Sequence, residues 1–169
     1  MAIRQIRLLG DPVLREPCTA VVDIDDEIRQ LIDDLMDTMY DAEGIGLAAP
    51  QIGVSQRVFV YDLSEEGHPP GVLVNPRIVE SEGTVRESEG CLSIPDLTEI
   101  VERSVSVVAE GLDREGRLVR LEADGLLSRC FQHESDHLDG ILFFDRISPL
   151  KRRMLLTKWA KRTREEGSG

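Results

Sequence analysis

The stretch Ser128–Gly140 constrains this chain more than any other, because it joins a helical apolar pattern to a metal-binding motif. In its sequence, SRCFQHESDHLDG, His133 and His137 stand four residues apart and Glu134 directly follows the first of them. On a helix such side chains lie one above the other, so two imidazoles can reach one divalent ion at about 2.0–2.1 Å beside a carboxylate. The alternative is an ordinary amphipathic helix with two incidental histidines, although His68 is the only other histidine in the chain.

The flanking residues predict that this stretch is helical. Asp124 stands where an N-cap is expected, and Gly140 is a natural helix stop. The apolar stripe of the helix would consist of Leu126, Leu127, Cys130, Phe131 and Leu138. Two imidazoles do not complete a metal site, so another segment of the chain must supply a third ligand.

The best candidate for that ligand is Cys91, in the segment Glu89–Pro95. Gly90 permits a sharp turn beside it, and a thiolate binds borderline and soft metals strongly. A buried free cysteine that packs as a small hydrophobic residue is the alternative. The chain has three cysteines, which argues against a secreted disulfide framework and predicts a reducing, cytoplasmic location.

Length and charge limit the classes of protein that fit. The 169 residues suit one catalytic domain over 1–165, in which 150–165 form a basic helix, followed by a frayed tail at 166–169. Residues 150–169 carry seven Lys/Arg against two Glu, so the remaining body is even more acidic than the whole, whose net charge is −12. An acidic body repels nucleic acid, and we expect no sequence-specific nucleic-acid binding. No apolar run approaches the roughly 18 residues that span a bilayer, so we expect no membrane partner.

Apolar periodicity changes along the chain from helical to strand-like. Residues 28–40 repeat at helical spacing after a capping Asp25, which predicts a long helix ending at Gly44. From residue 57 onward alternating apolar residues predict strands, and the connection 65–71 places His68 in a solvated loop. The expected fold is α+β: mostly antiparallel β-sheets around a central metal-binding HExxH helix, with a long N-terminal helix and a C-terminal helix.

The segment Gly44–Gly53 is unusual in composition. Its glycines at positions 44 and 46 let the backbone approach a ligand closely, and Gln51 is its one side chain with hydrogen bonds to donate. A helix stop followed by a plain loop is the alternative explanation. Taken alone, the segment is a weak signal.

Three segments in this order, GIGLAAPQ, EGCLS and QHESDH, resemble the peptide deformylase family of bacteria and organelles. The similarity extends to LLGDPVLR near the start and LEADGLL before the metal helix, and so covers residues 3 to about 150. The resemblance implies a metal-dependent hydrolase that removes the formyl group from the N-terminal formylmethionine of newly synthesised polypeptides and releases formate.

The resemblance also implies roles for individual residues. Cys91, His133 and His137 would hold one divalent metal ion, usually Fe²⁺ in this family, with Zn²⁺, Ni²⁺ or Co²⁺ also acceptable in purified protein. A metal-bound water or hydroxide would attack the formyl carbon, with Glu134 as general base and then acid. The oxyanion would be stabilised by the Gln51 side chain and the Leu92 backbone N–H. The substrate-binding positions would be Gly44, Ile45, Gly46, Glu89, Gly90, Leu126, Arg129 and Cys130.

Two positions of this chain depart from the family pattern. Arg129 stands where an aliphatic residue is usual, so its stem would line the pocket while its charge stays in water. Thr98 stands where some bacterial members have an arginine that contacts the substrate backbone. We further expect Arg103 to be a buried partner of Glu89 or Asp136, holding the surroundings of the metal in place.

After the metal helix, Ser148-Pro149 should begin the last helix. Its buried stripe would be Leu150, Met154, Leu155 and Trp159, leaving Lys151, Arg152, Lys158, Lys161 and Arg162 exposed. A solvated cationic face is the plain interpretation. The sharper one is contact with the ribosome, where formylated nascent chains emerge.

Two rival interpretations of the motif remain open at this point. A zincin-type peptidase would take its third ligand downstream of the helix, where Asp139 and Asp145 are available. A structural zinc module without catalysis would add Cys130 to Cys91 and the two histidines and so close the site with four ligands.

Overall fold

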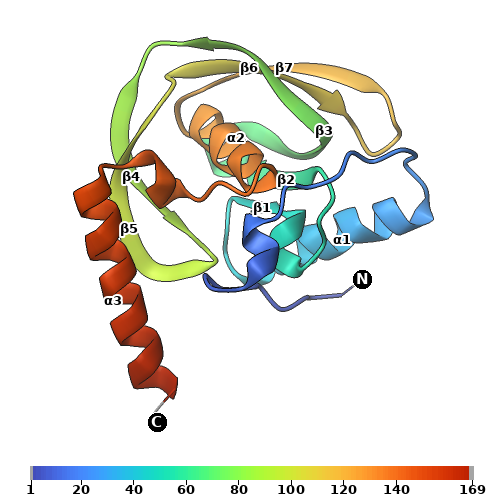
Figure 1. Cartoon of the computed structure of the whole chain (residues 1–169). Helices are drawn as coiled ribbons and strands as arrows, with labels where there is room; N and C mark the ends of the chain where they lie inside the picture. Colours follow the sequence, from blue (N-terminus) through green and yellow to red (C-terminus); the bar gives the residue numbers. More distant parts are fainter. Residues whose placement is uncertain (1, 168–169) are drawn as a thin grey trace.

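A curved antiparallel sheet with a helix on each face dominates the computed structural model, which describes residues 2–167 (Figure 1). The α-helices are α1 (Asp26–Asp41), α2 (Gly125–Leu138) and α3 (Pro149–Gly167). The strands are β1 (Gly46–Ala48), β2 (Val58–Leu63), β3 (His68–Glu82), β4 (Val85–Cys91), β5 (Ile94–Arg103), β6 (Ser106–Leu112) and β7 (Leu118–Asp124). Five strands form one sheet in the order β1-β2-β3-β6-β7, and β4 and β5 form a separate hairpin. All of these strand pairings are antiparallel, so the expected α+β fold is confirmed.

The alternating residues of β2 explain why the five-stranded sheet lies between α1 and α2. Val58 and Val60 belong to a buried cluster with the apolar stripe of α1. Phe59 and Tyr61 point to the opposite face and belong to a cluster with Phe131 of α2. Because successive side chains of a strand point to opposite faces, a fully apolar strand can be covered by helices on both sides.

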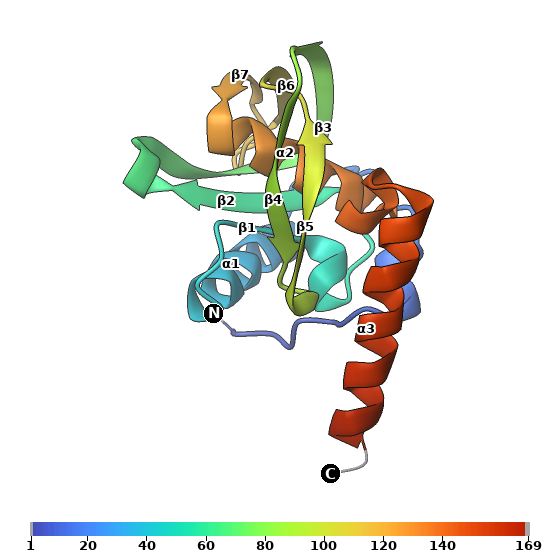
Figure 2. The same cartoon turned by 90° about the vertical axis from the view of Figure 1, so that its left-hand side faces the viewer.

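The β4–β5 hairpin and α3 form the other side of the molecule. A third buried cluster joins Val101 of β5 to Phe143 and Phe144, and to Leu155 and Trp159 of α3. Two perpendicular views show that α3 runs along this side and that its C-terminal end projects away from the body (Figures 1 and 2). Helix α2 therefore has the five-stranded sheet on one side and the hairpin on the other.

Several local expectations were wrong. Helix α1 is capped as expected, with Ile28 N–H donating to Asp25, but it ends at Asp41 rather than Gly44. Asp124 is the N-cap residue of α2, as expected, but its side chain makes no capping hydrogen bond. His68 does not lie in a loop, because β3 begins at this residue and pairs with the end of β2.

The segment Gly44–Gly53 is not a plain loop. Gly46–Ala48 form strand β1, paired with β2, and Ala49–Ile52 form a short 3-10 helix. This arrangement gives the segment fixed hydrogen-bonding partners and places Gln51 in the interior, where it is 2% exposed. A short strand followed by one helical turn is difficult to recognise from so few residues.

The ends of α1 and α3 also differ from the expected apolar stripes. Tyr40 is exposed because its hydroxyl donates to the Asp62 carboxylate. In α3, Leu155 and Trp159 are buried, but Leu150 and Met154 are exposed. Helix α3 includes Glu166 and Gly167, two of the four residues expected in the frayed tail, and the other two lie outside the described residues.

Within residues 2–167 the structure contains no helix that combines the length and the apolar character needed to cross a bilayer.

Candidate active site

Helix α2 and the end of β4 bring together one sulfur and two ring nitrogens. One ligand atom from each of Cys91, His133 and His137 can be chosen so that all three lie within 4.8 Å of one another. The Cys91 Sγ lies 3.3 Å from His137 Nε2, and the two imidazole centroids are 4.9 Å apart. A thiolate with two imidazoles is a donor set that suits borderline divalent metals, and three protein ligands leave one position open. These residues therefore fit the metal that the sequence predicts.

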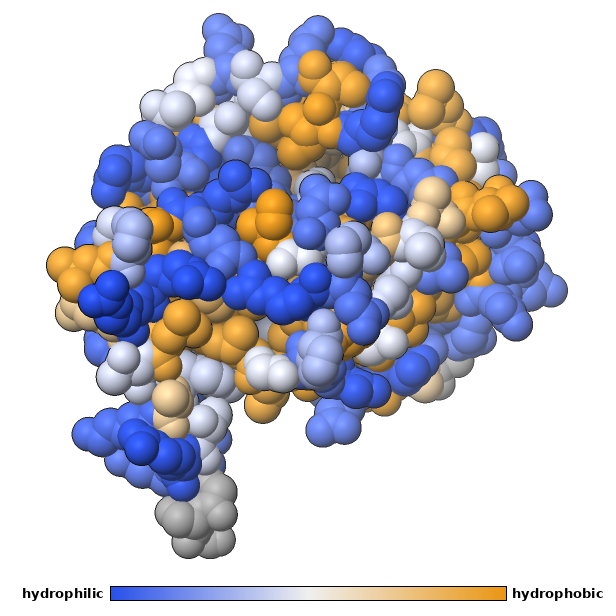
Figure 3. All heavy atoms as spheres, in the orientation of Figure 1, coloured by the Kyte–Doolittle hydropathy of each residue, from blue (hydrophilic) through white to orange (hydrophobic). Residues whose placement is uncertain are grey.

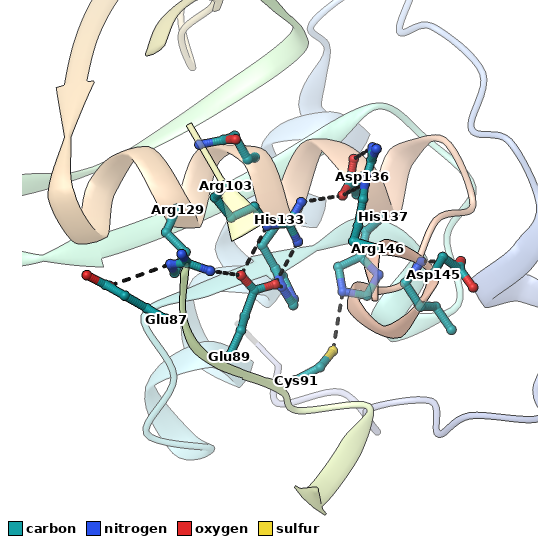
Figure 4. A network of polar contacts seen from close by, with 12 residues as sticks. Glu87, Glu89, Cys91, Arg103, Arg129, His133, Asp136, His137, Asp145 and Arg146 are labelled. Carbon is teal, nitrogen blue, oxygen red and sulfur yellow. Dashed lines mark hydrogen bonds and ion pairs between the residues drawn. The ribbon is translucent and has the colours of Figure 1, made fainter. Parts of the chain in front are cut away.

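Glu89 fixes the orientation of the first histidine (Figure 4). Its Oε2 lies 2.7 Å from His133 Nδ1, which directs His133 Nε2 toward Cys91. A ligand histidine usually donates its other ring N–H to a carboxylate in this way. Burial alone would raise the pKa of Glu89, but the hydrogen bonds from His133 and Arg103 hold this pKa well below its ordinary value. Glu89 is therefore an ionised acceptor.

Arg103 joins the hairpin to α2. Its Nε and Nη2 donate to the two oxygens of Glu89 at 3.1 and 2.6 Å, and its Nη1 donates to Asp136 at 2.6 Å. Asp136 also accepts from Arg146. The expected contact of Arg103 with Glu89 or Asp136 is confirmed, since it binds both. This buried network holds β4 and its terminal Cys91 against the helix that carries the histidines.

Glu134 is buried beside the cluster of Cys91, His133 and His137, and one of its carboxylate oxygens can still accept a hydrogen bond. It is 5% exposed, and its Oε1 has no hydrogen-bonding partner among the described residues. Burial raises the pKa of Glu134 to about 7, although the nearby His133 opposes this. A carboxyl with a pKa close to neutrality is suited to accept and return a proton. Burial lowers the pKa of His137. Burial also acts to lower the pKa of His133, but Glu134, Cys91 and Glu89 outweigh it and raise this pKa well above its ordinary value. A metal ligand must be neutral, so a bound metal ion would displace a proton from His133.

Gln51 lies beside the sulfur atom of the cluster. Its Oε1 accepts from Ala48 N–H at 3.0 Å, and its Nε2 lies 3.1 Å from Ser93 Oγ and 3.5 Å from Cys91 Sγ. The bond to Ala48 sets the orientation of the amide, so that its N–H groups point toward the thiol. The short helix Ala49–Ile52 that follows β1 therefore positions a donor beside the cluster.

A cavity of about 500 Å³ opens next to these residues. It is lined by every position that the family resemblance assigns to substrate binding, by Gln51, Leu92 and Glu134, and by Cys91 and His133, whereas His137 is not among its lining residues. Sequence reasoning missed Glu43, Ser88, Pro95 and Asp96, which also line the cavity. Their proximity in the chain to the GIGLAAPQ and EGCLS segments was the available signal.

Gly46 has no room for a side chain. A Cβ at this position would lie 2.7 Å from Glu134 Oε2 and 2.8 Å from Cys130 Sγ. Both distances are far shorter than a normal van der Waals contact. The absence of a side chain at this position therefore lets β1 approach α2 closely enough to form the wall of the cavity.

The geometry does not favour either rival of a three-ligand catalytic site. Among the described residues, Cys91, His133 and His137 form the one such group of potential ligands. Asp139 is paired with Arg57 and Asp145 with Arg15, so neither carboxylate is directed to the cluster. Cys130 lies outside the group, and burial raises its pKa well above the ordinary value, which keeps it a thiol.

Known proteins resemble this chain in sequence and in fold. The family described as polypeptide deformylase matches residues 3–153. A peptide deformylase of Alkalilimnicola ehrlichii is 53% identical over 166 residues, which cover 98% of this chain and 93% of that protein. The crystal structure of a peptide deformylase from Legionella pneumophila matches with a TM-score of 0.92 at 45% identity, covering 99% of each chain. A peptide deformylase from Synechococcus elongatus, solved in complex with actinonin, matches with a TM-score of 0.85 at 48% identity, covering 92% of this chain and 85% of that one. The chain therefore belongs to the peptide deformylase family.

Proposed function

We propose that this protein removes the formyl group from the N-terminal formylmethionine of nascent polypeptides, with Cys91, His133 and His137 holding the divalent metal ion. Membership of the family makes the protein a metal-dependent hydrolase. One observation supports this assignment of residues most strongly. The three potential ligands lie beside the buried Glu134, next to a cavity. When bound, the metal ion supplies a Lewis acid that activates water and polarises the formyl oxygen.

Glu134 is the proton carrier in this proposal. Water must lose a proton to attack the formyl carbon, and the departing amine must gain one, so a single carboxylate can serve both steps. The unpartnered Glu134 Oε1 can accept the first proton. The products are formate and a peptide with a free amino terminus.

Gln51 and Leu92 are the proposed donors to the oxyanion that develops on the formyl oxygen. Both line the cavity, together with Cys91. The Gln51 amide is held by Ala48 before substrate arrives. Donors that are already oriented need no reorganisation during the reaction, which is why such groups contribute strongly to rate.

The first side chain of the substrate would occupy the cavity between Gly44–Gly46 and α2. Ile45 and Leu126 are both about 40% exposed at this cavity. Such exposed aliphatic side chains are suited to cover a methionine side chain on binding.

A direct assay tests the proposed function. Protein purified without oxygen should contain one divalent metal ion per chain and should release formate from formyl-Met-Ala, while an unformylated peptide should remain intact. Chelation should abolish formate release, and readdition of the metal should restore it. Cleavage of an internal peptide bond without formate release would contradict the proposal.

We assign Fe²⁺ as the metal in the cell. The Cys-His-His donor set supports this assignment but also accepts Ni²⁺, Co²⁺ and Zn²⁺. The anaerobic metal analysis distinguishes these ions directly. A cytoplasmic location follows from the proposed substrate, since formylated chains are nascent there.

We further propose that α3 contacts the ribosome. On the face that Figure 3 shows, hydrophilic side chains gather on the part of α3 that projects from the body. Arg153, Lys158 and Lys161 are exposed on this helix. Arg162 is not available in the same way, because it binds the Asp96 carboxylate at 2.6 Å. An exposed cationic helix on an acidic protein is suited to touch the phosphate groups of ribosomal RNA.

Charge reversal tests the ribosome contact better than removal of the helix, because Leu155 and Trp159 belong to the core. Replacing Arg153, Lys158 and Lys161 together with glutamate should weaken ribosome binding by at least about 10-fold and should flatten its dependence on salt. Cosedimentation at several salt concentrations measures both effects. The matched control reverses three exposed arginines outside α3, namely Arg77, Arg86 and Arg117, and so changes the net charge by the same amount. Equal affinities for the two variants would refute a contact through α3.

A further inference from the structure

Arg129 brings a positive charge into the wall of the active-site cavity. It lies on α2 one turn before His133, is 5% exposed, and lines the cavity. Among the cavity-lining residues that the structure describes, it is the one arginine or lysine. The expectation that its charge would stay in water was therefore wrong.

The guanidinium of Arg129 is held by strand β4 (Figure 4). Its Nη1 donates to Glu89 Oε1 at 2.7 Å, and its Nη2 donates to the Val85 carbonyl at 3.3 Å. Its Nε lies 3.8 Å from the carboxylate of Glu87. A guanidinium has five N–H groups in a fixed plane, so these contacts set its orientation and still leave N–H groups able to donate.

Neutralising Glu89 does not require Arg129. Arg103 donates to both oxygens of Glu89, and the His133 ring lies 2.7 Å from one of them. The carboxylate therefore has three donors without Arg129. Arg129 therefore brings more hydrogen-bond donors to the cavity wall than the buried Glu89 carboxylate needs.

We propose that Arg129 is a specificity-determining residue that lets the cavity accept a first side chain ending in a hydrogen-bond acceptor, such as methionine sulfoxide, as well as methionine. This inference rests on the proposed deformylase function. The methylene groups of Arg129 can pack against a thioether, while its remaining N–H groups can bind a sulfoxide oxygen. In a purely aliphatic pocket that oxygen would be buried without a partner, which disfavours binding by about 10-fold or more.

The test compares three formyl peptides that differ only in the first residue. Formyl-Met-Ala-Ser, its methionine sulfoxide form and its norleucine form are assayed for kcat/KM with the wild type, Arg129→Met and Arg129→Lys. Methionine at position 129 keeps a long unbranched stem but removes every donor. We expect the ratio of kcat/KM for the methionine peptide to that for the sulfoxide peptide to rise about 10-fold in Arg129→Met and by less in Arg129→Lys. The ratio for methionine to norleucine should change little, because neither side chain has a strong acceptor.

The outcomes separate this inference from a merely structural role and from the function itself. If Arg129→Met lowers kcat/KM for all three peptides by one common factor, Arg129 only supports the fold and the inference is wrong. If Arg129→Met does not fold, Arg129→Lys serves as the test variant. A folded Arg129→Lys variant with an unchanged ratio of kcat/KM for the methionine peptide to that for the sulfoxide peptide would also count against the inference. Arg77→Met, on the exposed surface of β3, is the matched control and should leave the ratios as in the wild type. Failure of the wild type to release formate from any peptide would instead overturn the proposed function.

Discussion

Replacing Glu134 with glutamine should lower kcat/KM for formyl-Met-Ala by about 10²–10⁴-fold while the protein keeps its metal. Glutamine matches the volume of the buried Glu134 side chain but cannot accept the proton of the attacking water. The proposed metal ligands Cys91, His133 and His137 are unchanged by this substitution. Formate release and metal content measured on the same preparation check both parts of the prediction.

Two further outcomes make the Glu134 result decisive. A catalytically inert structural site would give a variant that matches the wild type in both measurements. Loss of metal together with activity would instead show that Glu134 supports the ligand cluster rather than the proton transfer. Glu134→Asp offers a matched comparison, because it keeps the carboxylate but withdraws it by one methylene group from the position beside Gly46.

Glu134→Gln should also raise the stability of the metal-free protein, by an amount that depends on pH. Burial raises the pKa of Glu134 to about 7, so the ionised carboxylate destabilises the folded, metal-free protein. This penalty is absent below the ordinary pKa of a glutamate, grows as the pH rises toward 7, and is complete above it. Glutamine carries no charge at any pH. The Tm of the chelated variant should therefore exceed that of the chelated wild type by more at about pH 8 than at about pH 5.

Replacing Gln51 with leucine should lower kcat by about 10²–10³-fold and should change KM much less. The Gln51 amide lies beside Cys91 and is held there by Ala48. Leucine has a similar size but cannot donate a hydrogen bond to the oxyanion. Because this interaction forms mainly in the transition state, its loss should appear in kcat rather than in KM, which steady-state kinetics can resolve.

Ser93→Ala is the matched control for Gln51. Ser93 is fully buried, and its hydroxyl is one of two groups near Gln51 Nε2. Its removal loosens the amide but leaves the donor in the cavity, so the loss of kcat should be well below that of Gln51→Leu. Equal losses in the two variants would mean that Gln51 matters for the shape of this region and not as a donor.

The parts of the site that lie on one regular element could be predicted from sequence because helix geometry is known in advance. The spacing of His133 and His137 determines that they share a face of α2. Glu134 is the residue directly after His133, so its position on the helix is fixed in the same way. The identity of Cys91 as a partner needed a chemical argument, because β4 and α2 are far apart in the chain. Resemblance to a family supplied the remaining positions, including Gln51.

The features that could not be predicted depend on contacts between elements. Tyr40 fits the helical stripe of α1, but its hydroxyl is drawn outward by Asp62. Leu150 and Met154 fit the stripe of α3, but both side chains remain more than half exposed, because no element among residues 2–167 covers them. The burial of Arg129 depends on Glu87, Val85 and Glu89, which β4 brings alongside α2. Periodicity along one segment contains no information about which neighbour a side chain will meet.

The separation of the β4–β5 hairpin from the five-stranded sheet has a consequence for how the enzyme tolerates change. No ladder of backbone hydrogen bonds joins these two sheets among residues 2–167, so the two halves of the catalytic cleft are aligned largely through side chains and the chain connections between them. The boundary between the two sheets thus passes through the proposed active site. Substitutions in the outer hairpin are therefore expected to displace Cys91, the proposed sulfur ligand, and to slow turnover while every helix and strand stays intact. An unchanged circular dichroism spectrum would not show that the enzyme is active.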